Sequence, residues 1–177
     1  MKTLAFSALI AASLLGAGEY KYEVTPVIGY TFPDYEQLLQ EHTVTGVQMQ
    51  FNDLYTALKP ELMLIYSDTD RYDERVGDTD IFRLALNGVY EFQNYYNVTP
   101  FVKAGLGYET MSDHYYDNHN ALFGDAAAGV KIGLTKRIGL KFEAMEMLKY
   151  NNPDWHNNLI YMGGVNFAFG ETMAPKR

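Results

Sequence analysis

The chain has 177 residues, 14 Lys and Arg against 22 Asp and Glu, a formal net charge of −8 and no cysteine. This length suits one domain and not comfortably two, and the lack of cysteine excludes a disulfide framework and a cysteine-ligated metal site. The acidic balance argues against a general nucleic-acid binder, which would carry a basic stripe. With 15 Tyr, 10 Phe, 15 Gly and only 20% charged residues, the chain is not a disordered polar polymer.

The first 18 residues have the organisation of a secretory signal peptide. Lys2 supplies a positive charge, residues 4–15 form an apolar run, and Ala17 and Gly18 lie among small residues that suit cleavage. The run is too short to anchor in a bilayer, and no stretch of about 18 apolar residues follows, which excludes a helical multi-span membrane protein. We therefore expect export, with cleavage after Ala17 or Gly18. A buried N-terminal helix is the less favoured alternative.

The rest of the chain alternates between apolar and polar residues with a period of two, as β-strands with one apolar face do. In residues 98–109, for example, Val102 and Leu106 alternate with Lys103 and Gly105. Eight segments show this pattern: residues 23–32, 43–52, 58–67, 80–92, 98–109, 121–134, 137–148 and 158–169. About ten residues is the length that a tilted strand needs to cross a bilayer.

The connections between these segments alternate in length. Those after the second, fourth and sixth segments are short, whereas the other four are long and polar: residues 33–42, 68–79, 110–120 and 149–157. Short turns at one end and long loops at the other are typical of outer-membrane barrels. In a soluble β-sandwich, nothing requires short and long connections to lie at opposite ends. The pattern predicts an all-β fold, an eight-stranded antiparallel up-and-down transmembrane β-barrel, over residues 19–170. Residues 171–177 would form a short C-terminal tail.

The aromatic residues indicate which face of the sheet meets lipid. They gather at both ends of the apolar face, as expected for rings at headgroup level, while the middle of that face is aliphatic. These two girdles comprise Tyr30, Phe32, Tyr66, Tyr108 and Tyr161 near the long loops, and Phe51, Tyr90, Phe167 and Phe169 near the short turns. The polar face is rich in glycine and alanine, which fit a tight barrel interior. A soluble periplasmic ligand-binding barrel, with the apolar face inside, is the alternative from another class.

Charged residues on the polar face are expected to point into the barrel. The candidate lumen cluster is Lys59, Glu61, Arg83, Lys103, Asp125, Lys131, Lys141 and Glu143, with Glu23 and Glu91 nearer the strand ends. Five basic and five acidic groups imply ion pairs, because an unpaired buried charge is costly. We expect Glu61, Arg83, Lys103 and Glu143 at the centre. Structural ion pairs that fill a narrow lumen are favoured, and rearranging pairs that gate a narrow small-solute pore are the alternative.

With these features in place, the chain resembles the eight-stranded outer-membrane β-barrel family of the OmpA transmembrane domain, OmpX and the opacity-type porins. The resemblance rests on residues 100–108 (PFVKAGLGY), the long-loop pattern and the last strand. In that strand Gly164, Phe167 and Phe169 resemble the insertion signal for the outer-membrane assembly machinery, although Met162 stands where a polar residue is usual. OmpA-like proteins add a periplasmic peptidoglycan-binding domain, and this chain fits either a barrel alone or one cut off before that domain.

The long loops hold candidate metal ligands. An acidic cluster in the second long loop comprises Asp68, Asp70, Asp73, Asp78 and Asp80. Alternating oxygen ligands suit calcium, but the turn glycine and closing glutamate of a calcium loop are misplaced, so a solvated acidic loop is favoured. In the third long loop His114 and His119, with Asp113 and Asp117, could ligate a divalent metal or respond to pH. We predict neither a metal nor a cofactor.

A lipid-active outer-membrane enzyme is a further hypothesis. It needs a nucleophile within hydrogen-bond distance of an activating histidine. After residue 18 the serines are Ser67 and Ser112, and Ser112 has His114 nearby. Neighbouring loop residues rarely converge as a triad, so we expect no enzyme, although an aspartate–histidine pair with His42 or His156 stays open.

The sequence thus predicts an outer-membrane barrel of a Gram-negative-type bacterium with a structural, envelope-integrity role. Its long loops would give it an adhesin-like role toward host surfaces, phage or other cells. The expected partners are outer-membrane lipid and lipopolysaccharide, the assembly machinery and extracellular molecules, with no nucleic acid. We expect a monomer.

Overall fold

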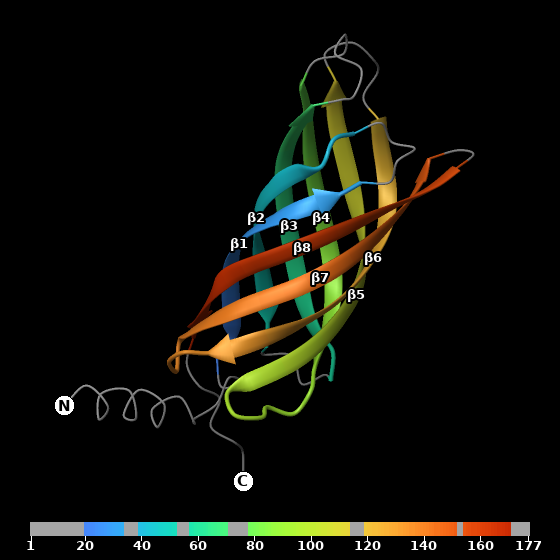
Figure 1. Cartoon of the computed structure of the whole chain (residues 1–177). Coiled ribbons are helices and arrows are strands. Elements are labelled where there is room, and N and C mark those ends of the chain that lie inside the picture. Colours follow the sequence, from blue (N-terminus) through green and yellow to red (C-terminus); the bar gives the residue numbers. More distant parts are fainter. Residues whose placement is uncertain are drawn as a thin grey trace, which may run out of the picture.

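A computed structural model describes residues 20–33, 39–52, 57–70, 78–113, 119–151 and 154–170. The expected signal peptide (1–18) and tail (171–177) lie outside these residues. Eight antiparallel strands form one closed barrel in which each strand pairs with its sequence neighbours and β1 pairs with β8 (Figure 1). The strands are β1 (Tyr22–Phe32), β2 (His42–Phe51), β3 (Lys59–Asp70), β4 (Asp78–Glu91), β5 (Val98–Asp113), β6 (His119–Gly133), β7 (Ile138–Asn151) and β8 (Asp154–Phe169). The predicted fold class is confirmed.

Side chains alternate between the interior and the outer face along each strand. In β4, Ile81 and Arg83 are buried inside, whereas Phe82 and Leu86 are exposed outside. Closure gives each strand of the barrel wall a hydrogen-bonded neighbour on both sides. No edge strand is then left with backbone N–H and C=O groups facing lipid, which could not hydrogen-bond to them. The apolar, ring-flanked face is therefore the outer one, as predicted. Among the described residues no helix is long and apolar enough to cross a membrane.

The outer face carries an aliphatic band between two rows of aromatic rings. Ile28, Leu86, Leu106 and Leu122 are 62–75% exposed. The predicted girdle residues Tyr30, Phe32, Tyr66, Tyr90, Tyr108, Tyr161 and Phe169 are exposed, and Phe51 and Phe167 are half-buried. So large an exposed apolar surface is unfavourable in water and suits a lipid environment.

The strands run further at the loop end than alternation predicts. β7 and β8 stay paired up to Asn151 and Asp154, so the prediction of a loop over residues 149–157 was wrong. Lys149 still points inward, but the polar residues 151–154, with Pro153 among them, indicate a turn and conceal the strand ends in the sequence. This hairpin projects away from the barrel wall at the upper right of Figure 1.

The turn between β4 and β5 is unusually tight. The backbone N–H groups and carbonyls of Tyr95 and Val98 bond each other at 2.9 and 3.0 Å. Between them Tyr96 and Asn97 have φ of 49° and 65°, and in the described ranges they are the non-glycine residues with positive φ. A two-residue turn of this kind matches the twist of the flanking strands.

Candidate functional site

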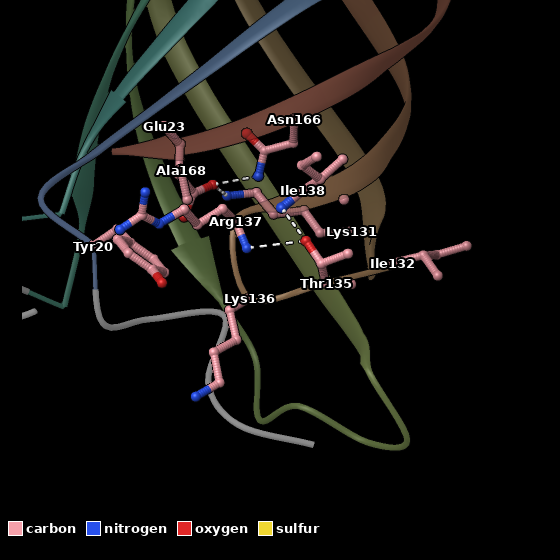
Figure 2. A pocket seen from close by; sticks show the side chains of 12 residues that line it. Tyr20, Glu23, Lys131, Ile132, Thr135, Lys136, Arg137, Ile138, Asn166 and Ala168 are labelled. Atoms are coloured by element: carbon pink, nitrogen blue, oxygen red, sulfur yellow. Dashed lines mark hydrogen bonds and ion pairs between the residues drawn. The ribbon is translucent and has the colours of Figure 1, made fainter. Parts of the chain in front are cut away.

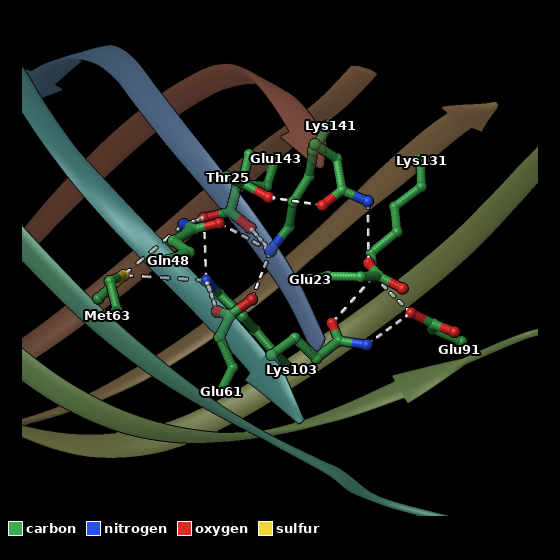
Figure 3. A network of polar contacts seen from close by, with 12 residues as sticks. Glu23, Thr25, Gln48, Glu61, Met63, Glu91, Lys103, Lys131, Lys141 and Glu143 are labelled. Carbon is green, nitrogen blue, oxygen red and sulfur yellow. Dashed lines mark hydrogen bonds and ion pairs between the residues drawn. The ribbon is translucent and has the colours of Figure 1, made fainter. Parts of the chain in front are cut away.

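The turn end of the barrel interior holds the first ion cluster (Figure 3). Lys131 of β6 donates to Glu23 at 2.6 Å, to Glu91 at 2.5 Å and to the Gln50 side-chain oxygen at 2.9 Å. Lys59 of β3 also pairs with Glu91. Two lysines therefore face two carboxylates, and five strands are tied together at this end.

A second cluster, the central ring, lies deeper in the barrel (Figure 3). Lys103 contacts Glu61 at 2.8 Å and Glu143 at 2.9 Å, and Lys141 contacts the same two carboxylates at 2.5 and 3.5 Å. Gln48 donates to Glu143 and accepts from Lys141. All five side chains are buried. The ring is neutral, and each charge has two opposite charges as partners.

An apolar belt crosses the interior next to the central ring, on its loop-end side. Met63 follows Glu61 by two positions along β3, and its sulfur lies 3.9 Å from both Lys103 Nζ and Gln48 Nε2. The belt comprises Val27, Val44, Met63, Ile65, Ala85, Phe123, Ala127, Met145, Met147, Ile160 and Met162. A lumen filled by ion pairs is therefore an incomplete description, because buried apolar side chains also fill it.

A third group of charges, the loop-end cluster, lies beyond the belt. Arg83 Nε and Lys149 Nζ each lie 2.7 Å from a different oxygen of Glu109. Arg83 pairs across the sheet with the belt residue Ile65, so its expected place in the central cluster was wrong. Lys149 was missed because it fell in the expected loop, although its inward position continues the alternation of β7.

Asp125 is buried among these groups but is held differently from the other carboxylates. In the orientation that satisfies both groups, the Asn87 amide nitrogen lies 2.8 and 3.1 Å from the two Asp125 oxygens. In the described part of the chain, the partner of Asp125 is thus the Asn87 amide and not the cation expected for an ion pair. Asn87 was missed because an inward asparagine on a polar face carries no distinctive signal.

A small cavity lies at the turn end, next to the first ion cluster (Figure 2). Its volume is about 30 Å³, which is about the space of one water molecule. The Arg137 guanidinium lies over the Tyr20 ring at 5.8 Å, and the backbone N–H groups of Arg137 and Ile138 donate to the Thr135 hydroxyl. The Tyr20 ring, the Arg137 guanidinium and the turn at Thr135 all line this cavity.

Solved structures match this barrel over nearly their whole length, whereas no protein-family model and no curated protein sequence matches the chain. Neisserial surface protein A (NspA) aligns with a TM-score of 0.67 and 12% identity, covering 86% of this chain and 99% of that one. OprG from Pseudomonas aeruginosa aligns with a TM-score of 0.59 and 10% identity, over 86% and 97% of the two chains. The outer membrane enzyme PagL aligns with a TM-score of 0.51 and 16% identity, over 83% and 99%.

This chain has the fold of the eight-stranded outer-membrane β-barrel family. At such low identities the likeness concerns the fold alone, and one fold carries many functions. An enzyme and a surface protein are both among the similar structures, so the outer-membrane barrel fold leaves catalysis undecided.

The candidate nucleophiles of this outer-membrane-type barrel lie on different faces. Ser67 is buried inside, and its hydroxyl has no hydrogen-bond partner among the described residues. Ser112 is exposed on the outside, and its neighbour His114 lies outside the described residues. His42 also faces the interior, where Nδ1 meets the Gln40 carbonyl at 2.9 Å.

The acidic cluster of the second long loop is only partly visible. Asp68 and Asp80 are exposed and pair directly across β3 and β4, and Tyr66 donates a hydrogen bond to Asp80. The side chains of Asp70, Asp73, Asp78, Asp113, His114, Asp117 and His119 lie outside the described residues. Within the described ranges no group of three or more His, Asp or Glu side chains could hold a metal ion.

The three residues of the expected insertion signal also have structural roles. Gly164 lies where β8 and β1 approach closely, because a Cβ there would come within 2.1 Å of the Pro26 carbonyl oxygen. Phe169 is exposed at the turn-end girdle, and Phe167 is half-buried. The requirement for glycine at position 164 therefore does not depend on recognition by another protein.

Proposed function

We propose that the chain is an outer-membrane protein that stabilises the envelope and presents an adhesin-like surface at its loop end. The observation that supports this proposal is the combination of a lipid-compatible outer band with an interior filled by ion pairs and the apolar belt. A barrel with a filled interior can contribute to the envelope as a membrane-embedded structural protein. It can also present the exposed loops at its end to other molecules. In this proposal the short turns face the periplasm and the long loops face the outside.

The β7–β8 hairpin supports a role in surface interaction. β1 pairs with β8 only as far as Leu159, and β6 pairs with β7 only as far as Lys149. In the described part of the chain, residues 154–156 of β8 therefore pair with β7 and with no second strand. An unpaired edge can add an extended segment of another protein through main-chain hydrogen bonds.

Membrane placement is tested by fractionation and by a heat-modifiability gel. We expect the protein in the outer-membrane fraction, released by detergent, with unheated and boiled samples migrating differently because the closed barrel resists denaturation. A protein that stays soluble without detergent would contradict the proposal. The same detergent-solubilised sample, analysed by light scattering, tests the proposed monomer.

The adhesin-like role is tested by shortening the hairpin. Replacing residues 150–155 by a two-residue Asn-Gly turn between the paired residues Lys149 and His156 removes most of the projecting edge and keeps Lys149 on Glu109. We expect reduced binding of intact cells to host-cell or abiotic surfaces, with unchanged heat-modifiability. A control that replaces Tyr96 and Asn97 by Asn-Gly changes the opposite end and should bind normally. Equal binding by both variants would contradict the role of the hairpin.

A narrow or gated pore is the second candidate function, favoured by the buried ion pairs and opposed by the apolar belt. We propose no catalytic role. Incubating the purified barrel with labelled lipid A, phospholipid or peptide tests this, with Ser67→Ala and Ser112→Ala as paired variants. Turnover that either variant abolishes would overturn the proposal.

A further inference from the structure

The outer face of the barrel carries a shallow groove, which we call the alanine groove. Two adjoining hollows of about 560 and 570 Å³ share Ala128 and Ala144 and extend from β4 to β8. Ala104 pairs across the sheet with Ala126, and Ala128 pairs with Ala144. Alanine is short, so these positions lie lower than neighbours such as Leu106, which is 75% exposed. The groove therefore offers a recess for an apolar chain on the lipid-facing side.

One outward charge, Glu146 of β7, lines the alanine groove on its loop-end side. Its side chain is exposed, and Ala144 and Leu148 are the next outward residues along the strand. Across the sheet Glu146 pairs with Ala126 of β6 and with Leu159 of β8. Leu148 is 46% exposed, so apolar surface continues beyond the carboxylate toward the loops. Glu146 therefore lies within the apolar outer surface.

The aromatic girdle indicates the depth of this carboxylate in the membrane. Tyr161 of the loop-end girdle pairs with Ala144, two positions from Glu146 along β7, and also lines the groove. Girdle rings mark the level at which lipid headgroups meet acyl chains. A lipid could therefore place its headgroup at Glu146 and an acyl chain along the alanines.

The chain supplies Glu146 with a neutral donor but with no cation. Asn157 of β8 donates a hydrogen bond to it at 2.7 Å, and an amide brings no charge. Among the described strand residues no lysine or arginine side chain is exposed, whereas Asp68 and Asp80 are. A second copy of the chain would thus meet Glu146 with charge of the same sign. A carboxylate beside hydrocarbon is stabilised by an opposite charge, which here has to come from the surroundings.

We propose that the alanine groove binds a membrane lipid whose headgroup carries a primary ammonium group, with the ammonium on Glu146. A primary ammonium offers three N–H donors, and a carboxylate accepts them through charge-assisted hydrogen bonds. The acyl chain of the same lipid fills the recess over Ala126 and Ala144. This inference rests on the membrane placement proposed above and names the class of lipid that the outer face selects.

The test measures lipid binding to the folded protein in detergent by native mass spectrometry. The probe is dioleoyl phosphatidylethanolamine. Phosphatidylcholine with the same chains keeps the positive nitrogen but lacks N–H donors, and phosphatidylglycerol lacks the amine. We expect phosphatidylethanolamine to bind about tenfold more tightly than either. Glu146→Gln should abolish this preference, whereas Asp80→Asn, which removes an exposed carboxylate outside the groove, should preserve it.

A second variant tests the recess separately from the charge. Ala126→Leu fills part of the groove and keeps Glu146, so it should weaken binding of all three lipids about threefold while the preference for phosphatidylethanolamine remains. Unchanged binding by this variant would contradict the recess as the acyl-chain site.

Three results would overturn the ammonium proposal. They are equal affinity of the natural chain for the three lipids, a preference that survives Glu146→Gln, and tighter binding of phosphatidylglycerol that a chelator abolishes. The last would mean that a divalent cation bridges Glu146 to a lipid phosphate. Fractionation tests membrane placement independently, so a protein found in the outer membrane without this lipid preference would contradict the present inference alone.

Discussion

Lys103, Lys131 and Lys141 each have more than one oxygen partner, and this explains how so many charges are tolerated inside. Lys131 meets two carboxylates and an amide oxygen, and Lys103 meets two carboxylates. The desolvation of an ion is offset only when its donors or acceptors are all used. The central ring nearly meets this condition: its buried Glu143 Oε2 has no hydrogen-bond partner among the described residues and lies 3.5 Å from Lys141 Nζ. Arg83 Nη1 is likewise buried without a hydrogen-bond partner in the described part of the chain.

Removing one member of the central ring tests this account. Lys103→Met keeps a similar volume but leaves Glu61 and Glu143 to share Lys141. We expect the free energy of unfolding to fall by about 3–5 kcal/mol, because a buried carboxylate loses its cation. Urea unfolding in detergent micelles measures the change. The double variant Lys103→Met/Glu61→Gln restores neutrality and should recover part of the loss, so a double variant less stable than the single one would contradict the pairing argument.

The register of each strand is determined by the period-two alternation of its side chains and by the lipid that contacts one face of the sheet. A residue at mid-strand faces either acyl chains or a packed interior, and a slip of one position exchanges the two. Beyond the apolar band, the polar residues 151–154 indicate a turn, although β7 and β8 stay paired there. That is why the loop end of β7 and β8 was mistaken for a loop while the band itself was located correctly.

A charge placed in the band tests the outward assignment. Leu86 of β4 is 62% exposed and lies between the girdles. Leu86→Arg should lower the free energy of unfolding in lipid vesicles by about 2–4 kcal/mol, since the charge must enter hydrocarbon. Tyr95→Arg is the matched control, because Tyr95 is 72% exposed in the short turn outside the band. Similar losses in the two variants would show that position 86 does not meet lipid.

The β4–β5 turn offers a stabilising change. Tyr96 holds a φ of 49°, which is strained for a residue other than glycine or asparagine. Tyr96→Asn should therefore raise the unfolding free energy by about 0.5–1 kcal/mol. Tyr95→Asn removes the same Tyr95–Tyr96 ring contact, 4.7 Å between centroids, without relieving φ. If the two variants have equal stability, backbone strain at position 96 is not the cause.

For the whole molecule, periodicity and loop lengths were enough to predict the closed barrel and the outward position of its apolar face. The interior was predicted less well. Alternation shows that Arg83 and Glu61 point inward, but strand tilt determines their relative height, and a single sequence does not reveal it. The belt also escaped notice, since inward methionines such as Met63 and Met145 look like interruptions of a polar face. Only the pairing registers bring them together with the belt residues of the other strands.

The belt and the central ring lie in series, so conduction should need both to open. We expect planar-bilayer recordings of the natural chain to show no steady current, because ions would have to cross an apolar layer and a neutral ring of ion pairs. Met145→Gly/Met147→Gly loosens the belt and keeps Met63, which contacts the ring, whereas Lys103→Met/Glu61→Gln alters the ring, so each should remain closed. The quadruple variant should conduct if it still shows heat-modifiability. A steady current through the natural chain would show that the interior rearranges in the membrane, and it would favour the gated pore over the structural role.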